Sequence, residues 1–293
     1  MSQIVISADK KFTLNLREIW EYRELLWMLA YRDIKVRYSQ TALGVAWALI
    51  QPLTTLVIFT LVFGRVVKVD TSGIPYSLFA LSGMALWGYF SMVMTQSGNS
   101  IITGQDMVKK IYFPRVIIPL SKSISAFVDF GVTLLFLLGM LVYHQYQPSV
   151  NAFFAIFFIL LTILSGLGLG IWLNALTIRY RDFQYVLPFV IQLGIYVSPV
   201  AYPSSLVPSE YQFFYYLNPM AGAIDGIRWA LFGSPINEGI YISIVSSVLL
   251  FVSGWLYFHK LEGEIADIVY QCWIRIKYTI RLKRVFLLNK RKS

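Results

Sequence analysis

Residues 152–178 read "AFFAIFFILLTILSGLGLGIWLNALTI", a run that contains no charged side chain. A helix of about 20 apolar residues crosses a hydrocarbon layer about 30 Å thick, so this run is long enough to span a membrane. The strands of a membrane barrel would alternate apolar and polar residues, and this run does not alternate. The stretch therefore predicts a transmembrane helix.

The rest of the chain has the same character, because 57% of its 293 residues are hydrophobic, 14% are charged and the mean hydropathy is +0.62. No soluble fold of this size would expose such a composition to water. We expect an all-α integral membrane protein with six transmembrane helices per subunit. The predicted spans are 42–63, 77–101, 116–143, 152–178, 183–199 and 239–258.

The lysines and arginines predict the orientation of the chain. Of the 25 in the sequence, all but Arg65, Lys68 and Arg228 fall in 1–41, 103–122, 177–185 and the segment from residue 259 onward. Because cytoplasmic loops carry the excess of positive charge, both termini are expected in the cytoplasm. The expected parts are a cytoplasmic interface segment 1–41, a six-helix transmembrane domain 42–258 and a basic cytoplasmic tail 259–293. Residues 1–41 have no apolar core typical of a cleavable signal, so the first span should direct insertion.

Residues 15–38 predict an amphipathic helix that lies in the membrane surface. Asn15 is suited to the N-cap, and Trp20 and Trp27 are suited to anchor the apolar face at the interface. Two interpretations remain open for this helix. It either floats on the membrane or also frames a docking cleft for a partner.

A short charged island, "GQDMVKKIYFPR" at 104–115, separates two predicted spans on the cytoplasmic side. Met107 and Ile111, like Val108 and Tyr112, are four residues apart and so share a helix face, and Pro114 ends the helix. A solvated hairpin would need only a few polar residues. The apolar pairs on so short a loop favour contact with a protein partner instead.

The sequence lacks the common signatures of an enzyme. No G-x-x-x-x-G-K-[ST] loop occurs, so ATP is not expected to bind in that way, and two histidines and Cys272 alone do not provide a familiar metal site. No nucleophile with a neighbouring base is evident. We therefore expect no catalytic residue, metal or cofactor in this chain.

Two features lie within predicted spans. Asp129 falls near the middle of the third span, where an ionised carboxylate is costly, so it should either pair with another helix or line a transport path. Gly166, Gly170 and Asn174 are four residues apart on one face of the fourth span. Small residues in this spacing predict a face for close helix packing.

Residues 202–235 are apolar and aromatic but are interrupted by Pro, Gly, Asp225 and Arg228. Such broken segments are tolerated at membrane depth only when they are buried in protein or line a cavity. We expect a re-entrant pair of short helices on the external side, before the sixth span. Its aromatic side chains either stack on sugar rings or form an interfacial belt.

The order of several motifs resembles the polysaccharide-exporting permeases of the type-2 ATP-binding-cassette (ABC) exporter family. The motifs are "RDIKVRYSQTALGVAWALIQPL", "KKIYFPRVIIPLS", "IRYRDFQYVLPF", "NPMAGAIDGIRWAL" and "GEIADIV". The resemblance implies a homodimer in the bacterial cytoplasmic (inner) membrane. Each copy would bind a cytosolic nucleotide-binding subunit that holds ATP and Mg²⁺, giving a heterotetramer. The implied cargo is lipid-linked O antigen, capsular polysaccharide or teichoic acid, and no nucleic acid is expected as a partner.

The resemblance also assigns roles to individual residues. The island 104–115 becomes a coupling helix that contacts the ATPase through Gln105, Asp106, Met107, Val108, Lys109 and Lys110. A gate for the pyrophosphate of the substrate is implied at Arg32, Asp33, Lys35, Arg37 and Tyr38. Asp225 and Arg228 would brace the external helices. As candidates for the polymer path we name Trp87, Tyr196, Tyr215, Tyr216 and Trp229.

The sequence departs from the family in two places. The family often has Glu where Asp225 stands, and its members commonly end soon after the segment matching "GEIADIV". The alternating basic and apolar residues of 271–293 have the periodicity of a strand, and we expect this tail to be held by anionic lipid or by the ATPase. The alternative functions are a membrane-embedded glycan or lipid transferase, and a carrier or channel without an ATPase partner. The first would need more acids, histidines or metal ligands, and the second would favour an internal repeat that the sequence lacks.

Overall fold

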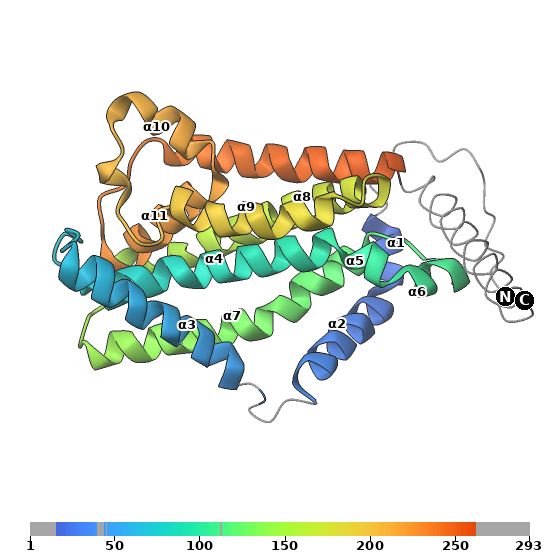
Figure 1. Cartoon of the computed structure of the whole chain (residues 1–293), viewed down its shortest axis with the longest axis horizontal. Helices are drawn as coiled ribbons and strands as arrows, with labels where there is room; N and C mark the ends of the chain where they lie inside the picture. The colour runs from blue at the N-terminus through green and yellow to red at the C-terminus, as the bar shows by residue number, and fades with distance from the viewer. Residues whose placement is uncertain (1–15, 40–43, 45, 112, 262–293) are drawn as a thin grey trace, which may run out of the picture.

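The computed structural model of the chain describes residues 16–39, 44, 46–111 and 113–261. All regular secondary structure in these residues is helical, which confirms the predicted all-α class. Asn15, proposed as an N-cap, and the tail from residue 262 onward lie outside the described residues, so the predictions made for them stay predictions. Figure 1 shows the long helices running side by side along the longest dimension of the protein.

The helices follow one another from the N-terminal segment to the last span. In chain order they are α1 (Leu16–Glu21), α2 (Arg23–Tyr38), α3 (Ala46–Phe59), η1 (Thr60–Val66, a π-helix), α4 (Tyr76–Gly98), α5 (Ser100–Thr103), α6 (Gln105–Lys110), α7 (Ile117–Tyr143), η2 (Val150–Phe154), α8 (Ala155–Arg179), α9 (Phe183–Val197), η3 (Ser204–Leu206), α10 (Ser209–Tyr216), α11 (Pro219–Phe232) and the helix Ile240–Leu261.

Five of the described helices are long and apolar enough to cross a membrane, and each coincides with a predicted span. They are Ala46–Val66, Tyr76–Gly98, Ile117–Tyr143, Val150–Arg179 and Ile240–Leu261. The sixth predicted span, 183–199, is the shorter helix α9, which has 15 residues. At 1.5 Å per residue α9 is about 22 Å long, which is less than the hydrocarbon thickness of about 30 Å. Its helix ends at Val197, so this span is not confirmed by length.

The centre of the bundle is the close contact between α4 and α8. A Cβ atom added at Gly166 would lie 3.3 Å from Val93, and one added at Gly170 would lie 2.7 Å from Ser97. On the same face, the Asn174 amide donates to the Ser97 carbonyl and to Ser100 Oγ. The close-packing face predicted for α8 is therefore confirmed, because only small residues let two backbones approach this far.

A second glycine contact lies on another face of α8. A Cβ added at Gly168 would lie 2.7 Å from the backbone of Phe251, and one added at Gly254 would lie 2.5 Å from the Gly168 carbonyl oxygen. The helix Ile240–Leu261 is thus packed against α8 as closely as α4 is. The spacing of Gly166, Gly170 and Asn174 gave no indication of this second contact.

The two ends of the bundle are built differently. At one end α10 and α11 form the predicted pair of short helices within 202–235, while α1, α2 and α6 lie near the opposite end in Figure 1. A separate apolar cluster fills that opposite end, centred on Leu29, Ile101 and Ile117. The predicted single helix 15–38 is broken at Tyr22 into α1 and α2. α2 packs along α7, so it is not an isolated surface helix.

Candidate functional site

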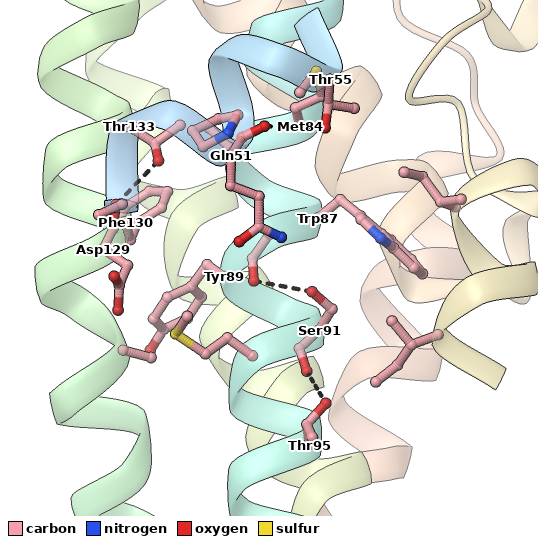
Figure 2. Close-up of a pocket in the computed structure, with 18 of the residues that line it drawn as sticks. Gln51, Thr55, Met84, Trp87, Tyr89, Ser91, Thr95, Asp129, Phe130 and Thr133 are labelled. Carbon is pink, nitrogen blue, oxygen red and sulfur yellow. Dashed lines mark hydrogen bonds between the residues drawn. The ribbon is translucent and has the colours of Figure 1, made fainter. Parts of the chain in front are cut away.

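A cavity of about 530 Å³ lies between α3, α4, α7 and α9. Figure 2 shows its residues converging from these helices, with Gln51 from α3, Trp87 from α4 and Asp129 from α7. The lining is of mixed character, since apolar side chains alternate with hydroxyl and amide groups. Its polar members are Gln51, Thr55, Tyr89, Ser91, Thr95, Gln96, Asp129, Thr133, Gln192 and Tyr196.

The hydroxyl groups of the cavity are mostly bound to the protein itself. Ser91 donates to the Gly88 carbonyl, Thr95 donates to the Ser91 carbonyl, and Tyr89 shares a 2.8 Å hydrogen bond with Ser123. The amides differ, because within the described part of the chain no hydrogen bond holds the side chains of Gln51, Gln96 or Gln192. Their donors and acceptors are therefore available to a ligand.

Two of the aromatic residues predicted for a polymer path line this cavity. Trp87 is buried, and its ring lies so close to Gly194 that a Cβ atom there would be 2.5 Å away. Tyr196, near the end of α9, is 64% exposed. The ring of Trp87 turns toward α9 in Figure 2, and α9 also carries Tyr196.

The other three predicted path residues lie elsewhere. Tyr216 is fully buried and donates to Asp225 Oδ2 over 2.8 Å, and its ring packs against Tyr215. Trp229 packs against Phe154, with ring centroids 5.5 Å apart. None of the three lines the cavity. They were proposed because they are aromatic and external, but in the fold they pack between the helices of that end.

Asp129 is the only charged residue that lines the cavity among the described residues, and its partners come from α2. Its carboxylate forms an ion pair with Arg37 and accepts a hydrogen bond from the Tyr38 hydroxyl. It lies about 18 Å from the start of α7, at 1.5 Å per residue, which is well inside the span. The predicted intramembrane carboxylate is therefore paired with another helix and also faces the cavity, while its role in a path stays a prediction.

A second ion pair joins the same two helices. Asp33 lies 2.6 Å from Lys122 and 3.0 Å from Arg32, whereas Lys35 is exposed. The residues that were expected to form a gate therefore fall into two groups. Arg32 and Lys35 face outward, while Asp33, Arg37 and Tyr38 hold α2 against α7.

Burial raises the pKa of Tyr38, and the hydrogen bond and negative charge of Asp129 raise it further, to about 12. The phenol therefore stays protonated throughout the physiological range. In this form it remains a hydrogen-bond donor to the carboxylate.

Asp225 and Arg228 are brought together within α11, with 3.9 Å between Oδ1 and Nη1. Arg228 Nη2 also donates to the carbonyl oxygens of Phe79 at 3.1 Å and Val200 at 3.0 Å, and its guanidinium carbon lies 3.4 Å from the centre of the Phe79 ring. This buried arginine thus joins α11 to α4 and to the segment after α9.

The island 104–115 contains α6, and its side chains divide by face. Met107 and Val108 pack toward the apolar cluster of that end, while Gln105 and Asp106 are exposed. The side chains of Lys109 and Lys110 lie outside the described residues. α6 thus rests on the bundle by its apolar face and presents a polar face outward.

Several contributors to the site were not predicted from the sequence. Gln51, Gln96, Gln192 and Lys122 stand singly within or beside long apolar runs. The sequence does carry one indication of them. An isolated polar side chain within a span is energetically unfavourable unless it faces protein or water. In the described part of the chain no three His, Cys, Asp or Glu residues are grouped so that they could hold a metal ion.

The fold and the cavity together define an all-helical integral membrane protein with a partly polar chamber among its spans. Comparison with known proteins identifies the kind: the chain belongs to the ABC-2 type transporter family, which it matches over residues 24–232. This match extends from α2 through α11 and so includes every helix that lines the cavity.

Individual relatives match along most of their length. The O-antigen export system permease protein RfbA of Klebsiella pneumoniae is 28% identical over 248 residues, covering 84% of this chain and 95% of the relative. The protein of the same name from Myxococcus xanthus is 25% identical over 254 residues, covering 84% and 96%. The polysialic acid transport protein KpsM of Escherichia coli is 23% identical over 247 residues, covering 82% and 94%.

Proposed function

We propose that this chain is the permease subunit of an ABC transporter that exports a lipid-linked cell-surface polysaccharide across the bacterial inner membrane. The observation that carries the proposal is the family match over residues 24–232, together with relatives named for O-antigen and polysialic acid export. O antigen, capsule and teichoic acid all remain possible cargoes. The cavity supports the proposal because it offers aromatic faces and free amides, the groups that contact sugar rings and hydroxyls.

In this proposal ATP and Mg²⁺ are bound by a separate cytosolic subunit, and α6 is the point of contact. Its apolar side chains rest on the bundle cluster, so a push on its polar face is passed to the ends of the spans. Gln105 and Asp106 are exposed and available for docking, and Lys109 and Lys110 complete the proposed contact. By the positive-inside rule this end and both termini face the cytoplasm.

A second copy of the chain is part of the same proposal. Only 6% of the most apolar stretch of Ala46–Val66 is buried within one chain, compared with 72% for α4. α3, within that exposed span, also forms one wall of the cavity. A homodimer in which these faces meet, with one ATPase subunit on each copy, would place two such cavities beside a shared path for the polymer.

The proposal is tested by expressing the tagged chain together with a candidate nucleotide-binding subunit from the same genome. We expect the two subunits to purify together and to hydrolyse ATP, and cells to display the polymer. Asp106→Ala, on the exposed face of α6, should lower export and ATPase stimulation. The matched control is Glu210→Ala, an exposed acid on α10 at the other end of the bundle, which should leave both unchanged. Failure of the subunits to associate, or equal effects of the two variants, would contradict the proposal.

A further inference from the structure

The end of α2 reaches the edge of the cavity through Arg37. Its guanidinium is paired with Asp129 and also lies 3.4 Å from the sulfur of Met92. Both Asp129 and Met92 line the cavity. A cation carried by a helix outside the four cavity walls is therefore placed at the cavity boundary.

This pair differs from the other ion pair between the same helices. Asp33 and Lys122 lie closer to the start of α7, and neither lines the cavity. The side chains of Arg37 and Asp129 are 26% and 17% exposed, so the pair is sheltered but can be reached. The Asp33–Lys122 pair fixes α2 on α7, whereas the Arg37–Asp129 pair places a positive charge where a ligand in the cavity can contact it.

The guanidinium of Arg37 can bind a phosphate group as well as a carboxylate. A guanidinium binds phosphate oxygens through two parallel hydrogen bonds, and a diphosphate carries more charge and more acceptors than one carboxylate. The neighbouring Tyr38 hydroxyl, which donates to Asp129, is a further donor for such an anion. Arg32 and Lys35, exposed on the same helix, add positive charge along the approach.

We propose that Asp129 is an internal competitor for Arg37. In the resting protein its carboxylate occupies the guanidinium, the diphosphate of the lipid-linked substrate displaces it, and the carboxylate takes Arg37 back when the substrate moves on. The inference rests on the proposed export function and adds a means of release. Without a competitor, the charge-assisted hydrogen bonds from the guanidinium would slow the release of the diphosphate.

The exchange also has a mechanical consequence. α2 ends at Tyr38 and α3, which supplies Gln51 and Thr55 to the cavity, begins at Ala46. When Arg37 leaves Asp129, the end of α2 is held on α7 by one ion pair instead of two. The exchange therefore loosens the end of α2 on α7, beside the cavity residues Asp129 and Met92.

Binding to the assembled complex, in nanodiscs of phosphatidylcholine, provides the test. The probe is a radiolabelled polyprenyl diphosphate, with phosphatidylglycerol as competitor. Asp129→Asn removes the competing charge but keeps the shape, and should bind the probe about fivefold more tightly than the wild type. The matched control is Asp33→Asn, which changes the acid of the other pair; it releases only Arg32 and Lys122, which do not line the cavity, so it should tighten binding less than Asp129→Asn. Arg37→Lys keeps the charge but loses the paired donors, and should weaken binding about tenfold.

Equal binding by Asp129→Asn and the wild type would overturn the proposal, and so would equal tightening by Asp33→Asn. Equal competition by phosphatidylglycerol would overturn the assignment to the substrate head group, because the site would then take any lipid phosphate. Co-purification with the ATPase checks that each variant is folded. If the wild type exports polymer with its ATPase but these binding results fail, only this inference falls. If no ATPase associates, the proposed function itself falls.

Discussion

Replacing Arg228 with methionine should destabilise the end of the bundle that carries α10 and α11. Met is long enough to fill much of the space, so the variant isolates the loss of polar contacts. Arg228 is 2% exposed and donates two hydrogen bonds, at 3.1 Å to Phe79 and 3.0 Å to Val200. Hydrogen bonds from a charged donor contribute about 1.5–3 kcal/mol each.

The magnitude follows from what each acceptor retains. The Phe79 carbonyl keeps a 2.8 Å hydrogen bond from Ser82, so it stays paired in the variant, whereas no other side chain in the described residues donates to the Val200 carbonyl. Asp225 also loses the guanidinium 3.9 Å away. We therefore expect Arg228→Met to lower the free energy of unfolding by about 3–4 kcal/mol. This is less than the summed contributions of the two charge-assisted hydrogen bonds and the ion pair.

The assay is unfolding in mixed micelles, driven by increasing sodium dodecyl sulfate and followed by tryptophan fluorescence. Arg65→Met serves as the control, because Arg65 is exposed in η1 and its loss should change stability by less than about 0.5 kcal/mol. Adding Asp225→Asn to Arg228→Met removes the uncompensated charge and should recover about 1 kcal/mol. The reasoning is refuted if Arg228→Met stays within about 1 kcal/mol of the wild type, or if the double variant recovers nothing.

Two further predictions concern other contacts. A Cβ at Gly226 would lie 2.0 Å from the Phe158 ring, so Gly226→Ala should lower the free energy of unfolding by about 1–3 kcal/mol. Adding Phe158→Leu to this variant should recover part of the loss. If the losses from the two substitutions simply add in the same micelle assay, the close approach of Gly226 to Phe158 is contradicted. The pKa of Tyr38 is raised to about 12, so its hydrogen bond to Asp129 is fully present below pH 10 and is lost as pH rises through 12. The difference in tyrosinate absorbance between the wild type and Tyr38→Phe should have its midpoint near pH 12. A midpoint near pH 10 would contradict the hydrogen bond between Tyr38 and Asp129 and the burial of the phenol.

Local pattern was enough to predict the parts of the fold that depend on neighbouring residues in the sequence. Five apolar runs predicted the long spans because length and hydropathy are properties of one segment. The spacing of Gly166 and Gly170 predicted a packing face, although nothing in it named α4 as the partner. The run 183–199 forms the shorter helix α9, which ends at Val197, so the sixth span stays a prediction.

The site depends on contacts that no local pattern contains. Arg37 and Asp129 are 92 residues apart, and each could be recognised only as a charge in an unusual place. For the aromatic residues of 202–235 the sequence left open stacking on sugar rings or an interfacial belt, whereas in the fold Tyr216 is buried and hydrogen-bonded to Asp225. Trp87 lines the cavity with its ring against Gly194 of α9, a contact that no nearby residue in the sequence indicates.

The two glycine contacts of α8 make it a natural reference frame for measuring motion in this protein. α4 and the helix Ile240–Leu261 are each held against it at backbone distance, so the three should move as one body. Spectroscopic labels at Leu160 on α8 and Ile58 on α3, which are 57% and 52% exposed, would span the boundary between this body and the sparsely covered first span. A change in that distance during ATP turnover would then be read as displacement of α3 alone, without a correction for rearrangement of the frame.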